Sequence, residues 1–401
     1  MSGERIVCVL RGKAALAHNL AVGIESFPVE LWREIFDYFD ANDLWYSFRG
    51  LNKQIDGIIN QIELHFNFEK TGNYDYFLKN IFPSTNVLSI RSLKIRKEKK
   101  IKHFFSIYSL NSLVQLRLLS LDGMYCTNDN LFTFWNQLSS LKYLRSLKII
   151  FGSKYHPNND LKDKEFLICS IFNQYFCPLL TCFTIENKGN DNLNTELPIA
   201  SLIQTIKPTN IKYLSIDCLN FVDLIKLLPA LQNAKSFSIE NGLFSDNQSH
   251  PQQIVTITEP LMSECRTLDL VLSVDITFEH IEYILKHTPN LKRLILSCYW
   301  FPLLDAKKWE LLLSTQCPSL VEFELGCNGD DDDNAYQKAG RVFDKRCKTR
   351  TFWKKRNAIV ITTAYAEDDY YYTTVVFNLE KEKGNDYYWR FLDEMDTTDT
   401  S

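Results

Sequence analysis

A six-residue apolar frame recurs nine times along this chain of 401 residues. Each copy has apolar residues at its first, fourth and sixth positions, as in "LRSLKI" and "LKRLIL". The copies begin at Ile90, Leu113, Leu144, Leu180, Ile211, Ala234, Cys265, Leu291 and Leu320, with steps of 23 to 36 residues between successive starts. Self-similarity at such a period is typical of repeat architectures, whose units stack to bury their apolar faces. This frame therefore restricts the fold more than any other feature of the sequence.

Helical patterns separate the frames. "FVDLIKLLPAL", "FEHIEYILKHTPNL" and "KKWELLLSTQCPSL" have apolar residues at helical spacing, and such stretches often end with Pro shortly before the next frame. A strand followed by a helix, repeated, predicts an α/β solenoid over residues 67–328, horseshoe-like, with strands lining a concave face. The irregular steps indicate degenerate repeats of the leucine-rich type.

A short segment rich in apolar residues precedes the repeats. "FPVELWREIFDYF", residues 27–39, has more apolar groups than one face of an amphipathic helix normally shows. Ser26 as N-cap and Pro28 in the first turn predict a helix that runs to Phe39. A second helix capped by Asn42 or Asp43, and a third in "KQIDGIINQI", would complete a unit so small that a partner is expected to stabilise it.

The same residues resemble the F-box. In "FPVELWREIFDYFDANDLWYSFRGLNKQIDGII" the family's pattern is matched by a Phe-Pro pair, a Glu-Leu pair, an Ile-Phe pair and an Asp-Leu pair, although Phe27 stands where Leu is usual. The resemblance implies an F-box over residues 24–66, after a leader over 1–23, that docks on the Skp1 adaptor of a cullin-RING ubiquitin ligase. The residues it assigns to Skp1 binding are Phe27, Pro28, Leu31, Ile35, Phe36 and Leu44. The "CPLL" and "CPSL" junctions, from Cys177 and Cys317, are similar to those of F-box proteins with leucine-rich repeats.

The alternate residues of the predicted strands should face away from the core and bind a protein client. The proposed client-binding residues are Lys94, Arg117, Lys148, Glu186, Asp217, Glu240, Asp269 and Glu324. We expect this face to be basic near the F-box and acidic toward the other end. Its acidic half is then expected to bind a basic segment of the client. The alternative is that these charges only solvate an exposed sheet face.

The composition of the sequence changes after Leu325. "GCNGDDDDNAYQKAG" predicts a loop, and "AIVITTAY" and "YYYTTVVFNL" predict a β-hairpin that caps the last repeat within residues 329–392. The tail over 393–401 is expected to be disordered. The loop is not a calcium site, because Ala335 and Arg341 replace the Gly and Glu that such a site requires.

Composition excludes several classes of function. The net charge of -4, from 45 basic and 49 acidic residues, predicts no broad phosphate-binding surface. Eleven cysteines without a regular framework indicate reduced thiols and a cytoplasmic or nuclear protein, and no apolar run is long enough to span a membrane. No catalytic, metal or cofactor signature appears, so we expect a binding protein and not an enzyme.

Two alternatives to a ligase subunit remain open. One is a leucine-rich-repeat scaffold, and the other is a nucleic-acid-binding module that uses "RSLKIRKEKKIK" and "KRCKTRTFWKKR", with Phe352 and Trp353 available for stacking.

Overall fold

The computed structural model describes residues 27–69, 74–124, 136–152, 170–172, 177–187, 208–245, 261–298, 301–330, 334–365 and 370–378. Across these residues the chain is a mixed α/β protein with an open sheet of twelve strands. It divides into two compact units, Met1–Asp217 and Cys218–Ser401. The expected leader over 1–23 and tail over 393–401 lie outside the described residues.

The first unit begins with three short helices, α2 (Val29–Phe36), α3 (Ala41–Ser47) and α4 (Lys53–Ile59). Their presence agrees with the sequence, but two boundaries differ. α2 ends at Phe36, because the chain turns there and the N–H of Phe39 donates to the Phe36 carbonyl at 3.0 Å. Asp40 caps α3 by accepting from the N–H of Asp43 at 3.0 Å, so neither Asn42 nor Asp43 is the cap. Ser26 lies outside the described residues.

The strands of the first unit pair in chain order and are parallel. They are β1 (Leu64–Asn67), β2 (Ile90–Arg96), β3 (Leu118–Met124), β4 (Ser146–Phe151), β5 (Cys182–Asn187) and β6 (Tyr213–Asn220), the last of which crosses the unit boundary. β1 precedes the first frame and was not expected. Between β1 and β2 lie α5 (Tyr74–Tyr76), a π-helical turn (Phe77–Ile81) and two 3-10 turns (Phe82–Ser84, Val87–Ser89). Between β2 and β3 lie α6 (Glu98–Ile107) and a 3-10 turn (Leu110–Ser112).

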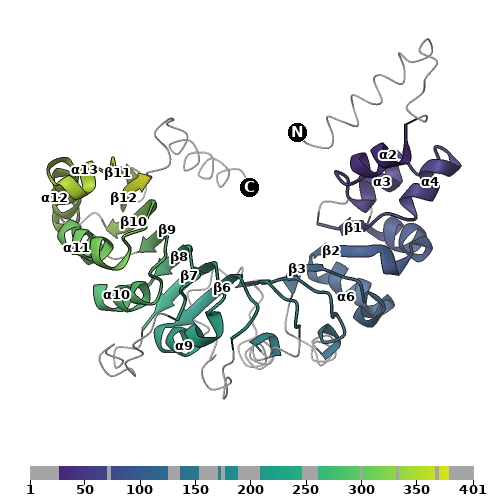
Figure 1. Ribbon diagram of the computed structural model, residues 1–401, viewed down its shortest axis with the longest axis horizontal. Coiled ribbons are helices and arrows are strands. Elements are labelled where there is room, and N and C mark those ends of the chain that lie inside the picture. The colour runs from purple at the N-terminus through teal and green to yellow at the C-terminus, as the bar shows by residue number, and fades with distance from the viewer. Residues whose placement is uncertain are drawn as a thin grey trace, which may run out of the picture. The chain divides into compact units, whose positions relative to one another are not determined.

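The second unit contains β7 (Ser236–Phe244), β8 (Thr267–Leu272), β9 (Arg293–Cys298) and β10 (Glu322–Asp330). α9 (Phe221–Leu227) precedes β7, α10 (Phe278–Lys286) lies between β8 and β9, and α11 (Ala306–Gln316) lies between β9 and β10. Short 3-10 turns follow α9 (Leu228–Leu231) and precede α11 (Phe301–Leu303). Figure 1 shows α10 and α11 along one side of these strands. The Trp309 ring of α11 lies 5.2 Å from the Phe323 ring of β10, which fixes this helix on the sheet. A helix thus lies between β8 and β9 and another between β9 and β10, as predicted, while most of the segment between β7 and β8 lies outside the described residues.

The end of the second unit differs from the sequence analysis. β10 continues to Asp330, and α12 (Asn334–Thr349) begins within residues 326–340, which were expected to form a loop. α13 (Thr351–Lys354) follows it. α12 is anchored by Phe343 and Cys347, one turn apart and both buried. The predicted hairpin is present as β11 (Ile359–Tyr365) and β12 (Tyr370–Asn378), and β12 pairs antiparallel with β10.

The apolar residues of the frames, except the half-buried Leu118, form the core of both units. β3 pairs Leu119 with Leu93 and with Leu147, so this repeat lies three residues later than the frame that begins at Leu113. Leu93 and Ile95 of β2 are fully buried, and the equivalent pairs of the other strands are also buried, while the alternate residues are mostly polar. We call the side of each unit's strands opposite these core residues the polar face. Among the described residues there is no disulfide, and no helix has the length and apolar character needed to cross a membrane.

Candidate partner-binding surfaces

α2 has two apolar stripes, and one of them is part of the core. Trp32 and Phe36 are each 1% exposed, and their ring centroids are 5.2 Å apart. Phe48, from the end of α3, lies 5.8 Å from Trp32 and 5.1 Å from Phe36. Phe39 adds an edge contact with Phe48 at 5.3 Å. This aromatic cluster lies among the helices α2, α3 and α4, which together we call the head.

The second stripe lies on the surface. Pro28 is exposed, Leu31 is 38% exposed, Ile35 is half-buried, and Tyr38, just beyond the helix, is 80% exposed. These residues stand at i, i+3, i+7 and i+10, so they share one face of the helix. We call them the α2 stripe. A second apolar face was expected on this helix, and Tyr38 extends it beyond the residues taken from the F-box pattern.

Two of the predicted Skp1 contacts belong to the core instead. Phe36 and Leu44 are each 1% exposed, so their side chains do not reach the surface. Phe27 is half-buried, with its ring 6.0 Å from that of Trp32. The spacing of apolar residues did not distinguish the two stripes, because neighbouring positions on a helix differ by only about 100°.

The rest of the chain already buries the inner side of the head. Asn42 of α3 donates from Nδ2 to the carbonyl of Asn67 in β1 at 2.6 Å. The Trp45 and Phe66 rings lie 6.5 Å apart, and the Tyr46 and Phe77 rings lie 4.9 Å apart. The expectation that a partner must complete the core of this small unit is therefore wrong. The α2 stripe remains exposed and available for a partner.

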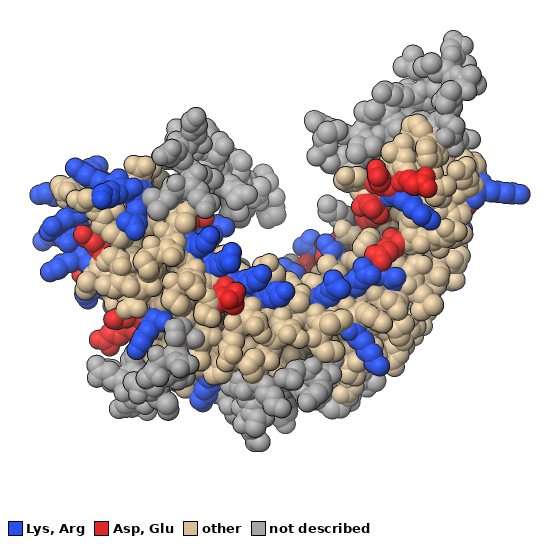
Figure 2. Space-filling view, in the orientation of Figure 1, with Lys and Arg blue, Asp and Glu red and all other residues tan. Residues whose placement is uncertain are grey.

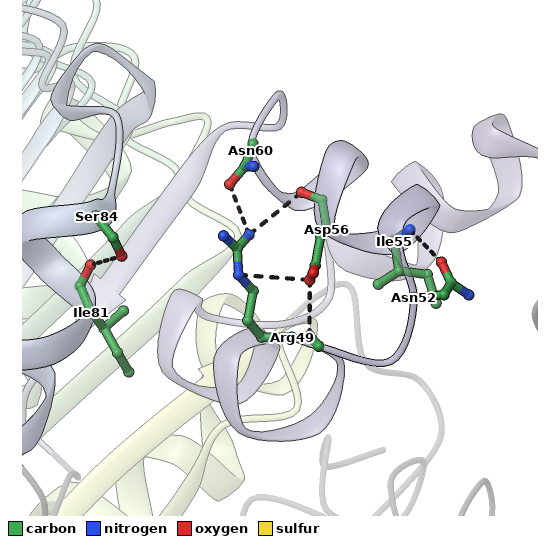
Figure 3. A network of polar contacts seen from close by, with 8 residues as sticks. Arg49, Asn52, Ile55, Asp56, Asn60, Ile81 and Ser84 are labelled. Atoms are coloured by element: carbon green, nitrogen blue, oxygen red, sulfur yellow. Dashed lines mark hydrogen bonds and ion pairs between the residues drawn. The ribbon is translucent and has the colours of Figure 1, made fainter.

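A polar network holds α3 against α4 (Figure 3). Arg49 donates to Asn60 Oδ1 at 2.8 Å, and its Nε lies 3.6 Å from Asp56 Oδ1. The same Asp56 oxygen accepts from the N–H of Gly50 at 2.9 Å. Gly50 has φ +80°, a conformation that other residues rarely adopt. These contacts give the head a fixed geometry from which α2 presents its stripe.

A pocket of about 330 Å³ opens on the polar face of the first unit, where the head meets the sheet. Its lining residues are Asp40, His65, Phe66, Asn67, Arg91, Ser92, Lys94, Arg117 and Leu118. Phe66 is fully buried, but Leu118 is only half-buried, so it contributes apolar surface among the charged groups. The volume is sufficient for one side chain or one small anion of a partner.

Three cationic side chains contribute to this pocket. Glu63 forms an ion pair with Arg91 at 3.0 Å and with Arg117 at 3.1 Å. No described carboxylate lies within ion-pair distance of Lys94. Desolvation lowers the pKa of the His65 imidazole and so favours its neutral form. Lys94 is thus the cation of this pocket whose charge is least compensated.

Other charges on the polar face of the first unit compensate one another. Lys148 and Glu186, on β4 and β5, form an ion pair at 2.9 Å, and Arg96 and Asp122 form one at 3.3 Å. Glu186 was expected to begin an acidic region, but its charge is balanced by Lys148. Asp217, the last residue of this unit, is half-buried.

The polar face of the second unit is acidic around Glu240 and Asp269. Burial raises the pKa of Asp269 to about 6, repulsion from Glu240 adds to this shift, and Arg293 opposes it. Arg293 also forms an ion pair with Glu322 at 3.3 Å. Glu324, a predicted client-binding residue, is 9% exposed and so presents little surface to a client. The accessible acidic region is therefore smaller than the sequence suggested.

Among the described residues, no three potential ligands gather as a metal site would require. Comparison with known proteins gives no match, either to a protein-family model or to a curated protein. What the α2 stripe and the polar face can bind therefore follows from the exposure, charge and packing of their own residues.

Proposed function

We propose that this chain is a substrate-recognition subunit of an SCF-type ubiquitin ligase. In this proposal residues 24–66 form an F-box, the α2 stripe binds a Skp1-type adaptor, and the strand-and-helix repeats are degenerate leucine-rich repeats that hold a protein client. The observation that carries the proposal is the α2 stripe. Its members lie on the surface of a head whose own core is already filled by Trp32, Phe36 and Phe48.

The α2 stripe leaves apolar side chains in contact with water in the free protein. Leu31 and Tyr38 expose apolar surface to water, although α2 could present charged residues there, as it does at Glu30, Arg33 and Glu34. A rigid helix with apolar residues one turn apart fits the groove of a helical partner. Few residues usually dominate such an interface, and Leu31 and Ile35 are central in this stripe.

The proposed mechanism is one of proximity. A client held by the repeats would keep its lysines near a charged conjugating enzyme, which raises their effective concentration without a catalytic residue in this chain. In the first unit, the pocket around Lys94 is a place on the polar face that could hold a client group. The proposed compartment is the cytoplasm or nucleus, where the cysteines would remain reduced.

Co-expression with a Skp1-type adaptor tests the proposal. Leu31→Asp with Ile35→Asp should lower the affinity of the complex more than about 100-fold, because two contacts that each contribute about 2 kcal/mol are lost. The matched control is Leu88→Asp with Ile107→Asp, which changes two apolar residues of the first unit, each 53% exposed, outside the head. Retention of the complex by the control and its loss in the head variant would support the proposal.

Two outcomes would contradict the ligase role. The first is that the parent chain does not bind the adaptor. The second is that both double variants bind it as the parent does. Either result would favour the alternative of a leucine-rich-repeat scaffold whose head only begins the repeat array. Far-UV circular dichroism of both variants would exclude a folding defect as the reason for lost binding.

A further inference from the structure

Basic side chains are concentrated on α12 and α13. Residues 338–356 contain nine Lys and Arg residues and one acidic residue, in a chain whose total charge is -4. Figure 2 shows Lys and Arg gathered over these two helices. Placing like charges one turn apart destabilises a helix by a few tenths of a kcal/mol per pair. This concentration of charge is therefore a feature to be explained.

Three of the nine cations have partners within the protein. Arg346 forms an ion pair with Glu310 at 3.3 Å, and Lys348 forms one with Asp344 at 2.6 Å. The guanidinium of Arg356 lies 4.0 Å from the centre of the Phe352 ring. The other six are exposed, and no described carboxylate lies within ion-pair distance of them. These six, which we call the α12–α13 cations, are Lys338, Arg341, Lys345, Arg350, Lys354 and Lys355.

Three of the α12–α13 cations form a row. Lys338, Arg341 and Lys345 stand at i, i+3 and i+7, so they lie on one face of α12. Successive members are separated by about 4.5 to 6 Å along the helix axis. Arg350, Lys354 and Lys355 continue the basic surface at the end of α12 and on α13. An extended polyanion could therefore contact several of them at once.

The apolar content of this surface argues against other partners. Val342, 57% exposed, is the only large apolar residue exposed on the described part of α12 and α13. Protein interfaces depend on buried aromatic or aliphatic anchors, and helices that bind membranes carry a large apolar face. Trp353 is fully buried, and Arg356 covers the half-buried Phe352, so the stacking of bases expected from the sequence is not available.

We propose that the α12–α13 cations bind the phosphate backbone of nucleic acid without reading its sequence. Phosphates give nucleic acid a high and regular charge density, and their neutralisation releases counterions, which drives binding without apolar contact. The Arg side chains can also bind phosphate oxygens with two donors at once. This activity is independent of the proposed adaptor function, because it uses neither the α2 stripe nor the polar face.

Fluorescence anisotropy of the full chain with labelled 20-mers of duplex DNA and single-stranded RNA tests the proposal and distinguishes the two sources of phosphate. If all six cations contact phosphates, the plot of log affinity against log salt should have a slope of about -4 to -5. Lys338→Gln, Arg341→Gln and Lys345→Gln together should reduce the magnitude of that slope by about 2 to 3.

A charge-matched variant provides the control. Lys142→Gln, Lys212→Gln and Lys226→Gln remove three exposed cations elsewhere and give the same net charge. This control should retain the affinity and salt slope of the parent. The proposal is overturned if the control loses as much affinity as the α12 variant, or if neither oligonucleotide binds at low salt. It is also overturned if poly-glutamate displaces the oligonucleotide at equal charge concentration, which would identify an acidic protein as the partner.

Discussion

The guanidinium of Arg117 pairs with the Glu63 carboxylate across 54 residues of sequence. Its Nη1 donates to Oε2 at 3.1 Å, and its Nη2 lies 3.1 Å from Oε1 as an ion pair. The Nε of Arg91 donates to the same carboxylate at 3.0 Å. Glu63 directly precedes β1, so this ion pair ties the end of the head to β2 and to the start of β3. It also places an internal anion beside the two arginines that line the pocket.

Replacing Glu63 by Gln should therefore expose the positive potential of the pocket. We expect Glu63→Gln to bind inorganic phosphate more tightly than the parent in a titration at low salt, because Arg91 and Arg117 lose their counter-charge. The stability loss should be only about 0 to 1 kcal/mol, since the Glu63 and Arg117 side chains are nearly half exposed. Glu34→Gln, an exposed carboxylate of α2, is the control. Equal phosphate binding by parent and variant would show that Glu63 does not limit access of anions to the pocket.

The two stripes of α2 should respond differently to truncation. Trp32→Ala should lower the free energy of unfolding by about 3 to 5 kcal/mol, because it leaves a cavity in the aromatic cluster. Leu31→Ala should lower it by less than about 1 kcal/mol, since the Leu31 side chain already meets water. Urea denaturation followed by far-UV circular dichroism measures both. A similar loss in the two variants would place the α2 stripe in the core and remove the basis for adaptor docking.

Asp269 should make stability depend on pH. Its pKa is raised to about 6, and burial is the main cause. A raised acid pKa favours the folded state where the group is protonated, and this contribution is lost as pH rises through about 6. Asp269→Asn should therefore stabilise the protein by about 1 to 2 kcal/mol at pH 7.5 and by nothing at pH 3.5, below the unfolded pKa. Denaturation midpoints of both proteins at the two pH values measure this.

Glu240 provides an internal check on that result, because its charge contributes to the pKa shift of Asp269. In a Glu240→Gln background, Asp269→Asn should give a smaller gain at pH 7.5. An equal gain in both backgrounds would mean that burial alone sets the pKa. If Asp269→Asn lowered the free energy of unfolding at pH 7.5, burial of the ionised Asp269 side chain would not destabilise the folded protein, and the prediction would be wrong.

The frames could be located from sequence because burial on a strand alternates. Leu93 and Ile95 lie two residues apart in β2, and each of the nine frames overlaps or leads directly into one strand of the sheet. The hairpin of β11 and β12 was equally clear from its β-branched and aromatic residues. β1 was missed, because it has four residues, and two of them are polar. α12 was missed, because charged residues outnumber its apolar anchors Phe343 and Cys347.

The candidate surfaces were only partly predictable, for two physical reasons. The apolar residues of α2 were visible in the sequence, but which of Ile35 and Phe36 is buried depends on how α3 packs against the helix. The charges of the polar face were also visible, but their compensation depends on strand register. Lys148 and Glu186 are 38 residues apart and meet only because β4 and β5 pair. The pocket depends on Glu63 in the same way, since its partners come from two later strands.

The acidic part of the polar face allows a test of client recognition that leaves the head unchanged. If Glu240 and Asp269 bind a basic client segment, Glu240→Gln with Asp269→Asn should remove basic proteins from the set that co-purifies with the chain, because complementary charge sets specificity. These substitutions keep side-chain size and relieve an unfavourable burial, so the fold should be retained. Quantitative mass spectrometry of co-purified proteins, with adaptor recovery as the internal standard, measures the change.

The control for this experiment removes the same charge from the helices. Glu279→Gln with Glu282→Gln changes two exposed carboxylates of α10, which do not belong to the polar face. We expect this control to retain the client set of the parent, and both double variants to retain the adaptor. Because surface charge also acts at long range, the comparison should be made near physiological salt, where the screening length is about 8 Å. Loss of the same clients from both variants would mean that net charge, and not the acidic part of the polar face, determines capture.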